Sequence, residues 1–345
     1  MPAPERISPR GVTPPPELLT LGELTVHGRV REASNAVLYC TVAYEGHSAA
    51  CVYKPVAGER PLWDFPDGTL AQREVASYEL SEAMGWSLIP QTVLRDGPYG
   101  QGMCQLWVEP TADGAGDGEG GADADADRAE DGGRAEDADR VGDGGPVEDG
   151  ERSENGHCSE AADRPGNGGR PRNGDLSDEV ALGGAAGLLA LIEGEEPGPG
   201  WKAIGFAEVG EGRTALLVHA DDVRLRRLAV LDAVINNGDR KGGHLLPASD
   251  GHFYAIDHGV TFNADDKLRT LLWGWAGEPL PADALDALRR LSADLAVGGP
   301  LVARLAELIT AVEIEALRGR VADLLRTGRH PVPSGEWPAI PWPPV

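Results

Sequence analysis

Residues 236–246 read NNGDRKGGHLL and decide how the rest of the chain is interpreted. One short polar stretch holds an aspartate, an arginine, a lysine, two glycines and a histidine, and it directly follows an apolar run. Such a stretch can be a solvated turn between two buried elements. It can also be a loop whose charged side chains carry out chemistry, and the flanking sequence favours this second interpretation.

The two flanks of this stretch predict ordered elements. Residues 223–237, VRLRRLAVLDAVINN, have helical apolar periodicity and follow a pair of aspartates suited to a helix N-terminus. Residues 252–260, HFYAIDHGV, read as a strand that runs into a turn. Gly242, Gly243 and Gly259 allow sharp turns, so we expect the loop and the second turn to face a common point.

The residue types at that point suit phosphoryl transfer. This chemistry needs a carboxylate to orient or deprotonate the acceptor hydroxyl, and oxygen or nitrogen ligands that hold Mg²⁺ against the phosphates. Asp239, His244 five residues later, and Asp257 at the strand end meet these needs. Arg240 and Lys241 add positive charge for an anionic substrate or for the transferred group.

The N-terminal part predicts a small sheet with one helix. Strand-like runs, a helical run and a hairpin occupy residues 24–30, 37–44, 49–56, 70–85, 91–96 and 101–109. Lys54 lies at the end of the third strand and Glu74 near the start of the helix. Lys54 alone fits a solubilising charge on an edge strand. A strand lysine followed by a helix glutamate is also the pair that binds nucleotide phosphates in kinases.

The chain divides into four stretches by composition. Residues 18–110 and 182–330 carry the predicted elements, and residues 331–345 form a proline-rich tail. Between the two halves, residues 111–181 are rich in Asp, Glu and Gly; positions 111–180 hold 21 Asp plus Glu and 7 Arg. This stretch cannot bury enough apolar area to offset its ordering entropy, so we predict a disordered acidic insert. It fits either an interaction segment or a tolerated surface-loop insertion.

Several classes of function are disfavoured. A formal net charge of -25 over 345 residues disfavours nucleic-acid binding, which rewards clustered Lys and Arg. No window approaches the ~18 consecutive apolar residues of a membrane span, and the N-terminus lacks the pattern of a signal peptide. The four cysteines lack the close pairing of a zinc site. We therefore expect a cytoplasmic protein without an integral membrane segment.

The ordered motifs resemble a known group of enzymes. Asp239-Arg240-x-x-x-His244 resembles the DRxxxN catalytic loop of phosphatidylinositol 3-/4-kinases, and the phrase IDHG at residues 256–259 resembles their IDFG metal-binding phrase. HipA-type bacterial protein kinases have a similar spacing. Together with VYKP, REVASYELS and VLDAVINNGDRKGGH, these motifs are similar to an actinobacterial SCO-type family that resembles phosphatidylinositol kinases. The resemblance covers nearly the whole chain outside the acidic insert.

The resemblance implies a role for each matched residue. Lys54 would bind the ATP phosphates and Glu74 would pair with it. Asp239 would be the catalytic aspartate and Asp257 the main Mg²⁺ ligand, with His244 at the position of the metal-binding Asn. The remaining nucleotide contacts would come from the first turn and from the strand after the hairpin, namely Ser34, Asn35, Trp107, Val108 and Glu109.

The chain departs from the pattern in three places. It lacks GxGxxG, so residues 31–36, REASNA, would form the phosphate loop. Position 244 is His rather than Asn, and imidazole is a softer ligand that suits Mn²⁺ or Zn²⁺ better than Mg²⁺. This histidine would bind metal, contact a phosphate or stabilise the loop. Binding of a phosphoinositide headgroup would require a basic stretch after IDHG, and the stretch in this chain is not strongly basic.

The sequence thus predicts an α+β, two-lobed, protein-kinase-like fold, with a small antiparallel-sheet N-lobe and a mainly helical C-lobe. The expected activity is ATP-dependent phosphoryl transfer to an unidentified hydroxyl on a lipid, protein or small molecule. The alternatives are a HipA-like Ser/Thr kinase, a nucleotide-binding pseudokinase without turnover, and an AMP transferase.

Overall fold

The computed structural model describes residues 15, 17–30, 35–66, 68–109, 180–181, 187–208, 213–248 and 251–343. The predicted acidic insert therefore lies outside the described residues, except for its last two positions. Ser34, in the predicted phosphate loop, also lies outside them.

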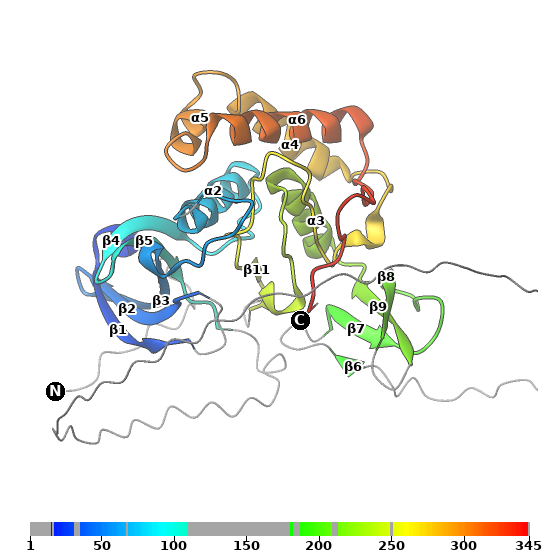
Figure 1. Ribbon diagram of the computed structural model, residues 1–345, viewed down its shortest axis with the longest axis horizontal. Coiled ribbons are helices and arrows are strands. Elements are labelled where there is room, and N and C mark those ends of the chain that lie inside the picture. Colours follow the sequence, from blue (N-terminus) through cyan, green and yellow to red (C-terminus); the bar gives the residue numbers. More distant parts are fainter. Residues whose placement is uncertain are drawn as a thin grey trace, which may run out of the picture. The chain divides into compact units, whose positions relative to one another are not determined.

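The N-terminal part is a five-stranded antiparallel sheet with the order β1-β2-β3-β5-β4 (Figure 1). Its strands are β1 (Glu23–Arg29), β2 (Leu38–Tyr44), β3 (His47–Pro55), β4 (Thr92–Gly97) and β5 (Gly100–Leu106). Helix α1 (Glu17–Leu21) precedes the sheet, and α2 (Leu70–Ala83) is inserted between β3 and β4. The strands and α2 match the predicted segments within a few residues; α1 was not predicted.

Alternation along β3 gives the sheet two different faces. Cys51 and Tyr53 are fully buried on one face, in a cluster with Leu18 and Leu19 of α1. Lys54 follows Tyr53 and therefore points to the opposite face, where α2 packs against β4 and β5. The position of the lysine in the strand thus directs its side chain toward the helix that carries Glu74.

The C-terminal part contains a second antiparallel sheet, of which the sequence predicts only one strand, TALLVHA at residues 214–220. The order is β6-β7-β9-β8, formed by β6 (Val180–Ala181), β7 (Leu189–Ile192), β8 (Trp201–Glu208) and β9 (Thr214–Ala220). Strand β6 takes the last two residues of the predicted insert. Strand β8 alternates only between half-buried and exposed side chains, which explains why its apolar pattern was weak.

Helices make up most of the rest of the C-terminal part. They are α3 (Val223–Ile235), α4 (Ala282–Asp294), α5 (Pro300–Leu305) and α6 (Ala311–Thr327). Asp222 caps α3 through a 2.7 Å hydrogen bond from the Arg224 amide. A short hairpin of β10 (Leu245–Pro247) and β11 (Phe253–Ala255) follows α3. The prediction of an α+β fold with an N-terminal antiparallel sheet and a mainly helical C-terminal part is confirmed.

One apolar core runs from α2 into the C-terminal helices. It includes Val75 and Leu80 of α2, Leu228 of α3, Leu288 of α4 and Leu317 of α6, all fully buried. Helix α2 lies beside the first sheet in Figure 1, and it contacts both that sheet and α4. This continuous core fixes α2, with its glutamate, against the part of the chain that carries the polar loop.

The proline-rich tail is attached to the fold. The carbonyl of Ala339 accepts hydrogen bonds from the Thr270 amide (3.1 Å) and from the Trp273 indole (2.8 Å). Within the described ranges, none of the helices combines the length and the apolar character needed to cross a bilayer.

Candidate active site

Lys54 is held between two carboxylates that come from distant parts of the chain. Its ammonium lies 2.6 Å from Glu74 Oε1 and 3.1 Å from Asp257 Oδ1. Burial opposes the charge on the lysine, but the charges of Asp257 and Glu74 outweigh burial and raise the pKa of Lys54. The lysine is therefore cationic at neutral pH and oriented in advance.

Glu74 joins three elements at this point. It is 2% exposed, and its second oxygen accepts a 2.9 Å hydrogen bond from the His258 amide. A buried carboxylate is stable only when its oxygens are paired; here one oxygen pairs with Lys54 and the other with the backbone after Asp257. Glu74 consequently sets the distance between β3 and the Asp257 turn.

Asp257 has a backbone conformation that favours glycine. Its φ is +62°, and Gly259 has no left-handed φ; a Cβ at Gly259 would instead meet the Leu70 side chain at 3.3 Å. The expected turn is thus made by Asp257 itself, while Gly259 allows close packing on α2. The Asp257 side chain is 51% exposed, and Lys54 holds its pKa well below the usual range. Asp257 is an ionised carboxylate that faces solvent.

Asp239 lies at the other side of the same site. Its amide donates a 2.9 Å hydrogen bond to Asn237 Oδ1, and its carboxylate lies 3.0 Å from the Lys241 ammonium. Burial raises the pKa of Asp239, Lys241 opposes this shift, and the negative charge of Asp257 adds to it. The two aspartates are therefore close enough to influence each other electrostatically.

His244 connects the two ends of the site. Its Nδ1 accepts the Lys241 amide at 3.3 Å, and its Nε2 lies 3.3 Å from Asp257 Oδ2. Burial, helped by nearby cations, lowers the pKa of His244 to about 4, so the imidazole is neutral at pH 7. Because Nδ1 faces a donor, the hydrogen of the neutral ring lies on Nε2 and points to Asp257.

Arg240 differs from its predicted role beside the substrate. Its side chain is fully buried and pairs with the equally buried Asp232 of α3 at 3.0 Å. It also donates to the Ile256 carbonyl at 2.9 Å and to His258 Nε2 at 2.6 Å. A guanidinium with these partners cannot reach a substrate. Arg240 positions the loop on α3 and on the Asp257 turn.

The buried partners of Arg240 were not selected from the sequence. Asp232 also accepts hydrogen bonds from Asn237 at 3.0 Å and from Thr270 at 3.2 Å. A signal for Asp232 exists: it is a lone carboxylate inside the apolar run LAVLDAVI, and such a residue needs a buried partner. His258 gives no such signal, because a histidine after an aspartate fits a turn equally well.

The predicted nucleotide contacts lie in the turn before β2 and directly after the end of β5. Asn35 Oδ1 accepts the Arg60 amide at 3.0 Å, so this side chain already stabilises its own turn. Trp107 follows β5, is 42% exposed and donates its amide to the Ala50 carbonyl at 3.0 Å. That amide is therefore engaged within the sheet. Val108 and Glu109 continue past the strand end.

The charged groups fit a metal that arrives with its phosphates. Within the described ranges, no group of three or more His, Cys, Asp or Glu side chains forms a ready cage. Mg²⁺ in phosphoryl-transfer sites is typically held by one or two carboxylates plus substrate phosphates. The half-exposed, ionised Asp257 supplies such an oxygen ligand, and His244 Nε2 lies beside it.

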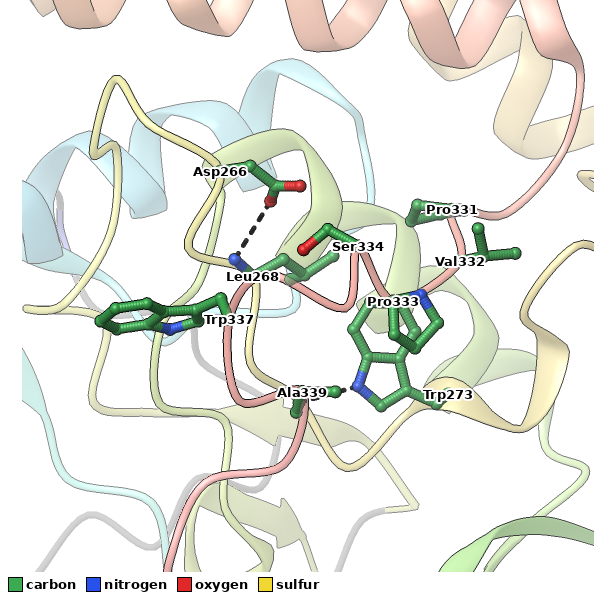
Figure 2. Close-up of a pocket in the computed structure, with 9 residues that line it drawn as sticks. All are labelled: Asp266, Leu268, Trp273, Pro331, Val332, Pro333, Ser334, Trp337 and Ala339. Atoms are coloured by element: carbon green, nitrogen blue, oxygen red, sulfur yellow. Dashed lines mark hydrogen bonds between the residues drawn. The ribbon is translucent and has the colours of Figure 1, made fainter. Parts of the chain in front are cut away.

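Figure 2 shows a pocket between the segment after Asp257 and the proline-rich tail. Its lining comes from Asp266, Leu268 and Trp273 of that segment and from residues 331–339 of the tail, including Trp337. None of the residues that contact Lys54 lines it. The pocket is a seam between the tail and the segment after Asp257.

Fold and site together define a mixed α+β protein whose charged centre is a lysine–carboxylate cluster between β3, α2 and the loop after α3. Protein Rv2133c of Mycobacterium tuberculosis is 43% identical to the chain over 326 residues, which is 94% of either sequence. The chain belongs to the same family as that protein. No family model matches the chain.

Comparison with solved structures gives more distant similarities. The Golgi casein kinase with Mn/ADP bound superposes with a TM-score of 0.43 and 11% identity, over 90% of this chain and 73% of that one. The proinflammatory kinase CtkA of Helicobacter pylori gives a TM-score of 0.37 and 9% identity, over 90% and 94%. We base the functional proposal on the geometry of the site.

Proposed function

We propose that the protein is an ATP-dependent phosphotransferase that moves the γ-phosphoryl group to a hydroxyl acceptor. The observation that carries this proposal is the position of Lys54. Its ammonium bridges a buried glutamate at 2.6 Å and a half-exposed aspartate at 3.1 Å. The glutamate orients the cation, and the aspartate leaves a solvent-facing oxygen for a phosphate-bound metal.

Each residue of the site then has a distinct task. Lys54 binds the phosphates, and Glu74 keeps the lysine in place. Asp239 accepts a hydrogen bond from the acceptor hydroxyl and receives its proton, which fits a carboxyl whose pKa burial raises. A divalent metal, held by Asp257 and the phosphates, supplies charge neutralisation of the transferred group when bound. Lys241 adds positive charge beside Asp239.

The remaining assignments concern the rest of the nucleotide, the metal and the two lobes. The turn at Asn35 approaches the phosphates, and the chain after β5, at Trp107, Val108 and Glu109, lines the base. The metal is Mg²⁺ or Mn²⁺. Residues 18–110 and 182–330 form the two lobes around the nucleotide, with the acidic insert between them and the proline-rich tail last.

Incubation of purified protein with γ-labelled ATP and a host-cell extract tests the activity. Lipid, protein and metabolite fractions are separated, because the acceptor is a phosphoinositide-like lipid, a Ser/Thr side chain or a small hydroxyl compound. Label in one fraction identifies the class of acceptor. If AMP rather than phosphate is added, the acceptor gains the mass of AMP, and the phosphotransferase proposal is wrong.

The variants Asp239→Asn and Asp257→Asn connect the activity to the site. We expect both to lose labelling, while the matched Asp286→Asn, on the exposed face of α4, retains it. Copurifying activity from another enzyme would label the acceptor equally in all three variants. That outcome would contradict the proposal.

A second candidate is a nucleotide-binding protein without turnover, and His244 favours it. Its ring hydrogen faces Asp257, so the nitrogen that would ligate a metal is a donor in this arrangement. This candidate predicts that ATP with metal raises the melting temperature of the wild type. It also predicts that any slow phosphate release is the same in the wild type and in Asp239→Asn.

A further inference from the structure

Arg269 is held directly against the loop that carries Asp239. Its amide donates to the Asn237 carbonyl at 2.8 Å, and its carbonyl accepts the Arg240 amide at 3.1 Å. These two hydrogen bonds lie on either side of Asp239 in the sequence. The backbone of Arg269 is thus fixed beside the proposed catalytic aspartate, although the two residues are thirty positions apart.

The Arg269 side chain has a charge without a carboxylate partner among the described residues. The ion pairs found there include most of the other arginines of the C-terminal part but not this one. Its Nε is buried and makes no hydrogen bond. Its positive charge still acts on Asp239, whose carboxylate it stabilises. A buried donor without an acceptor lowers the stability of the fold. A bound anion that accepts hydrogen bonds from this guanidinium would offset that loss.

The segment that carries Arg269 is fixed from both sides. Thr270 Oγ1 donates to Asp232 at 3.2 Å, and the Thr270 amide donates to Ala339 of the tail. The Trp273 indole reaches the same carbonyl, as Figure 2 shows. Arg269 is therefore presented on a rigid support, as a residue that selects a substrate requires.

We propose that Arg269, together with Lys241, forms the acceptor subsite and selects a hydroxyl compound that carries a phosphate or carboxylate group near the reacting hydroxyl. This inference rests on the proposed phosphotransferase activity and names the chemistry of its acceptor. The guanidinium offers planar, paired donors that match such an anion. Lys241, whose ammonium lies 3.0 Å from Asp239 and whose side chain is 24% exposed, provides a second cation beside that aspartate.

The reaction then balances without another reactant. The acceptor hydroxyl oxygen forms a bond to the γ-phosphorus, and the bond between that phosphorus and the β,γ-bridging oxygen breaks. ADP leaves with that electron pair. The hydroxyl proton passes to Asp239 and from there to solvent. The anion of the acceptor stays on Arg269 throughout and orients the hydroxyl toward Asp239.

Binding measurements test the subsite without turnover. Ligand-observed NMR is recorded with ADP, Mg²⁺ and sn-glycerol 3-phosphate, which has hydroxyls beside a phosphate; glycerol is the neutral control. We expect saturable binding of the phosphate compound by the wild type, binding at least tenfold weaker in Arg269→Gln, and partial recovery in Arg269→Lys. The matched Arg289→Gln, on exposed α4, retains wild-type affinity. Equal affinity in wild type and Arg269→Gln overturns the subsite, as does the absence of binding to the wild type.

Steady-state kinetics then separate selection from catalysis. With γ-labelled ATP, we expect Arg269→Gln to lower the ratio of kcat/KM for sn-glycerol 3-phosphate to that for glycerol at least tenfold, mainly through KM. Vesicles of phosphatidylcholine with phosphatidylglycerol present glycerol hydroxyls beside a phosphodiester on a membrane. Transfer to the soluble compound only, or to the vesicles as well, distinguishes a free acceptor from a lipid headgroup, and either supports the subsite.

The two proposals fail in different ways. Arg269-dependent binding of sn-glycerol 3-phosphate without any transfer of label supports the subsite and overturns the phosphotransferase. Transfer that is equally fast to glycerol and to its phosphate, in both wild type and Arg269→Gln, supports the phosphotransferase and overturns the subsite. If Arg269→Gln does not fold, Arg269→Lys keeps the charge but loses the paired donors, and it must still weaken binding.

Discussion

Two consecutive residues of one loop, Asp239 and Arg240, lie in opposite surroundings. Arg240 is fully buried, and its donors meet Asp232, His258 and a carbonyl. Asp239 has a side chain that is 31% exposed, and among the described residues its ion-pair partner is Lys241 alone. The loop therefore has an interior half in which charges are saturated and an outer half in which charges remain available.

The difference separates stability from chemistry. Charges in the interior half have strong partners in a low-dielectric environment, and removing one partner leaves the other uncompensated. Charges in the outer half contribute little to stability because solvent screens them. The same charges are the ones that can meet a ligand. Substitutions in the two halves should therefore give opposite phenotypes.

The largest expected effect is on stability. Arg240→Met leaves Asp232 buried without its main partner, and we expect the free energy of unfolding to fall by roughly 3–5 kcal/mol. Urea denaturation measures this change. Arg289→Met, at an exposed position of α4, should change it by less than about 0.5 kcal/mol. A loss below about 1 kcal/mol for Arg240→Met would remove the distinction between the two halves.

The reverse phenotype is expected for Asp257→Asn. Loss of the solvent-facing carboxylate should reduce phosphoryl transfer by about 100- to 1,000-fold, because an electrostatic contact to the transferred group is lost. The pair with Lys54 is half-exposed on the aspartate side, so the free energy of unfolding should change by less than about 1 kcal/mol. The measurements are initial rates with labelled ATP and urea denaturation of the same preparation. Retained transfer within tenfold would contradict this assignment.

A buried histidine outside the loop should give a pH dependence of stability. Burial lowers the pKa of His219 to about 4, against the charges of Asp221 and Glu278 and with that of Lys202. The unfolded chain binds this proton below about pH 6.5, whereas the folded protein does not until about pH 4. Stability should therefore fall as the pH is lowered from 6.5 to 4, by roughly 1.4 kcal/mol per pH unit.

Urea denaturation at several pH values checks this expectation. In the variant His219→Gln, the unfolded chain no longer binds this proton. The free energy of unfolding should therefore change less steeply with pH than in the wild type, by the roughly 1.4 kcal/mol per pH unit that one proton contributes. A slope that is the same in both proteins would show that other groups account for the acid sensitivity.

The smallest expected effect concerns the choice of metal. His244→Asn replaces an imidazole nitrogen by a carboxamide oxygen, the type of ligand that Mg²⁺ prefers. We expect the ratio of activity with Mg²⁺ to activity with Mn²⁺ to rise by roughly tenfold. Parallel assays in the two metals measure the ratio. An unchanged ratio would indicate that His244 acts only on Asp257 and not on the metal.

The sequence predicted the parts of this protein that local patterns encode. Strand-like composition located β3, and helical periodicity located α2, so the Lys54–Glu74 pair followed from elements identified separately. Asp257 and Asp239 were found because a short loop and a strand end converge. These inferences needed only spacing and residue type.

The remaining features depend on tertiary contacts that no local pattern records. Arg240 looks like a substrate contact in the sequence, because no local pattern shows that this loop is buried or that Asp232 of α3 is its ion-pair partner. Arg269 has no pattern of its own and acquires its position from hydrogen bonds to residues thirty positions away. Of the second sheet, β6 and β7 are short and β8 alternates only between half-buried and exposed side chains, so local patterns revealed only β9.

Arg73, the neighbour of Glu74 on α2, determines how the site can move. Its guanidinium pairs with Glu313 of α6 at 2.5 Å and donates to the Thr261 carbonyl at 2.6 Å, and it is only 1% exposed. Withdrawal of α2 from Lys54 would break both of these buried contacts together. The lysine–glutamate pair is thus already formed in this structure. Regulation by movement of α2 toward and away from Lys54 would cost the free energy of both buried contacts of Arg73. Regulation would act more readily on what enters the site than on whether the site is assembled.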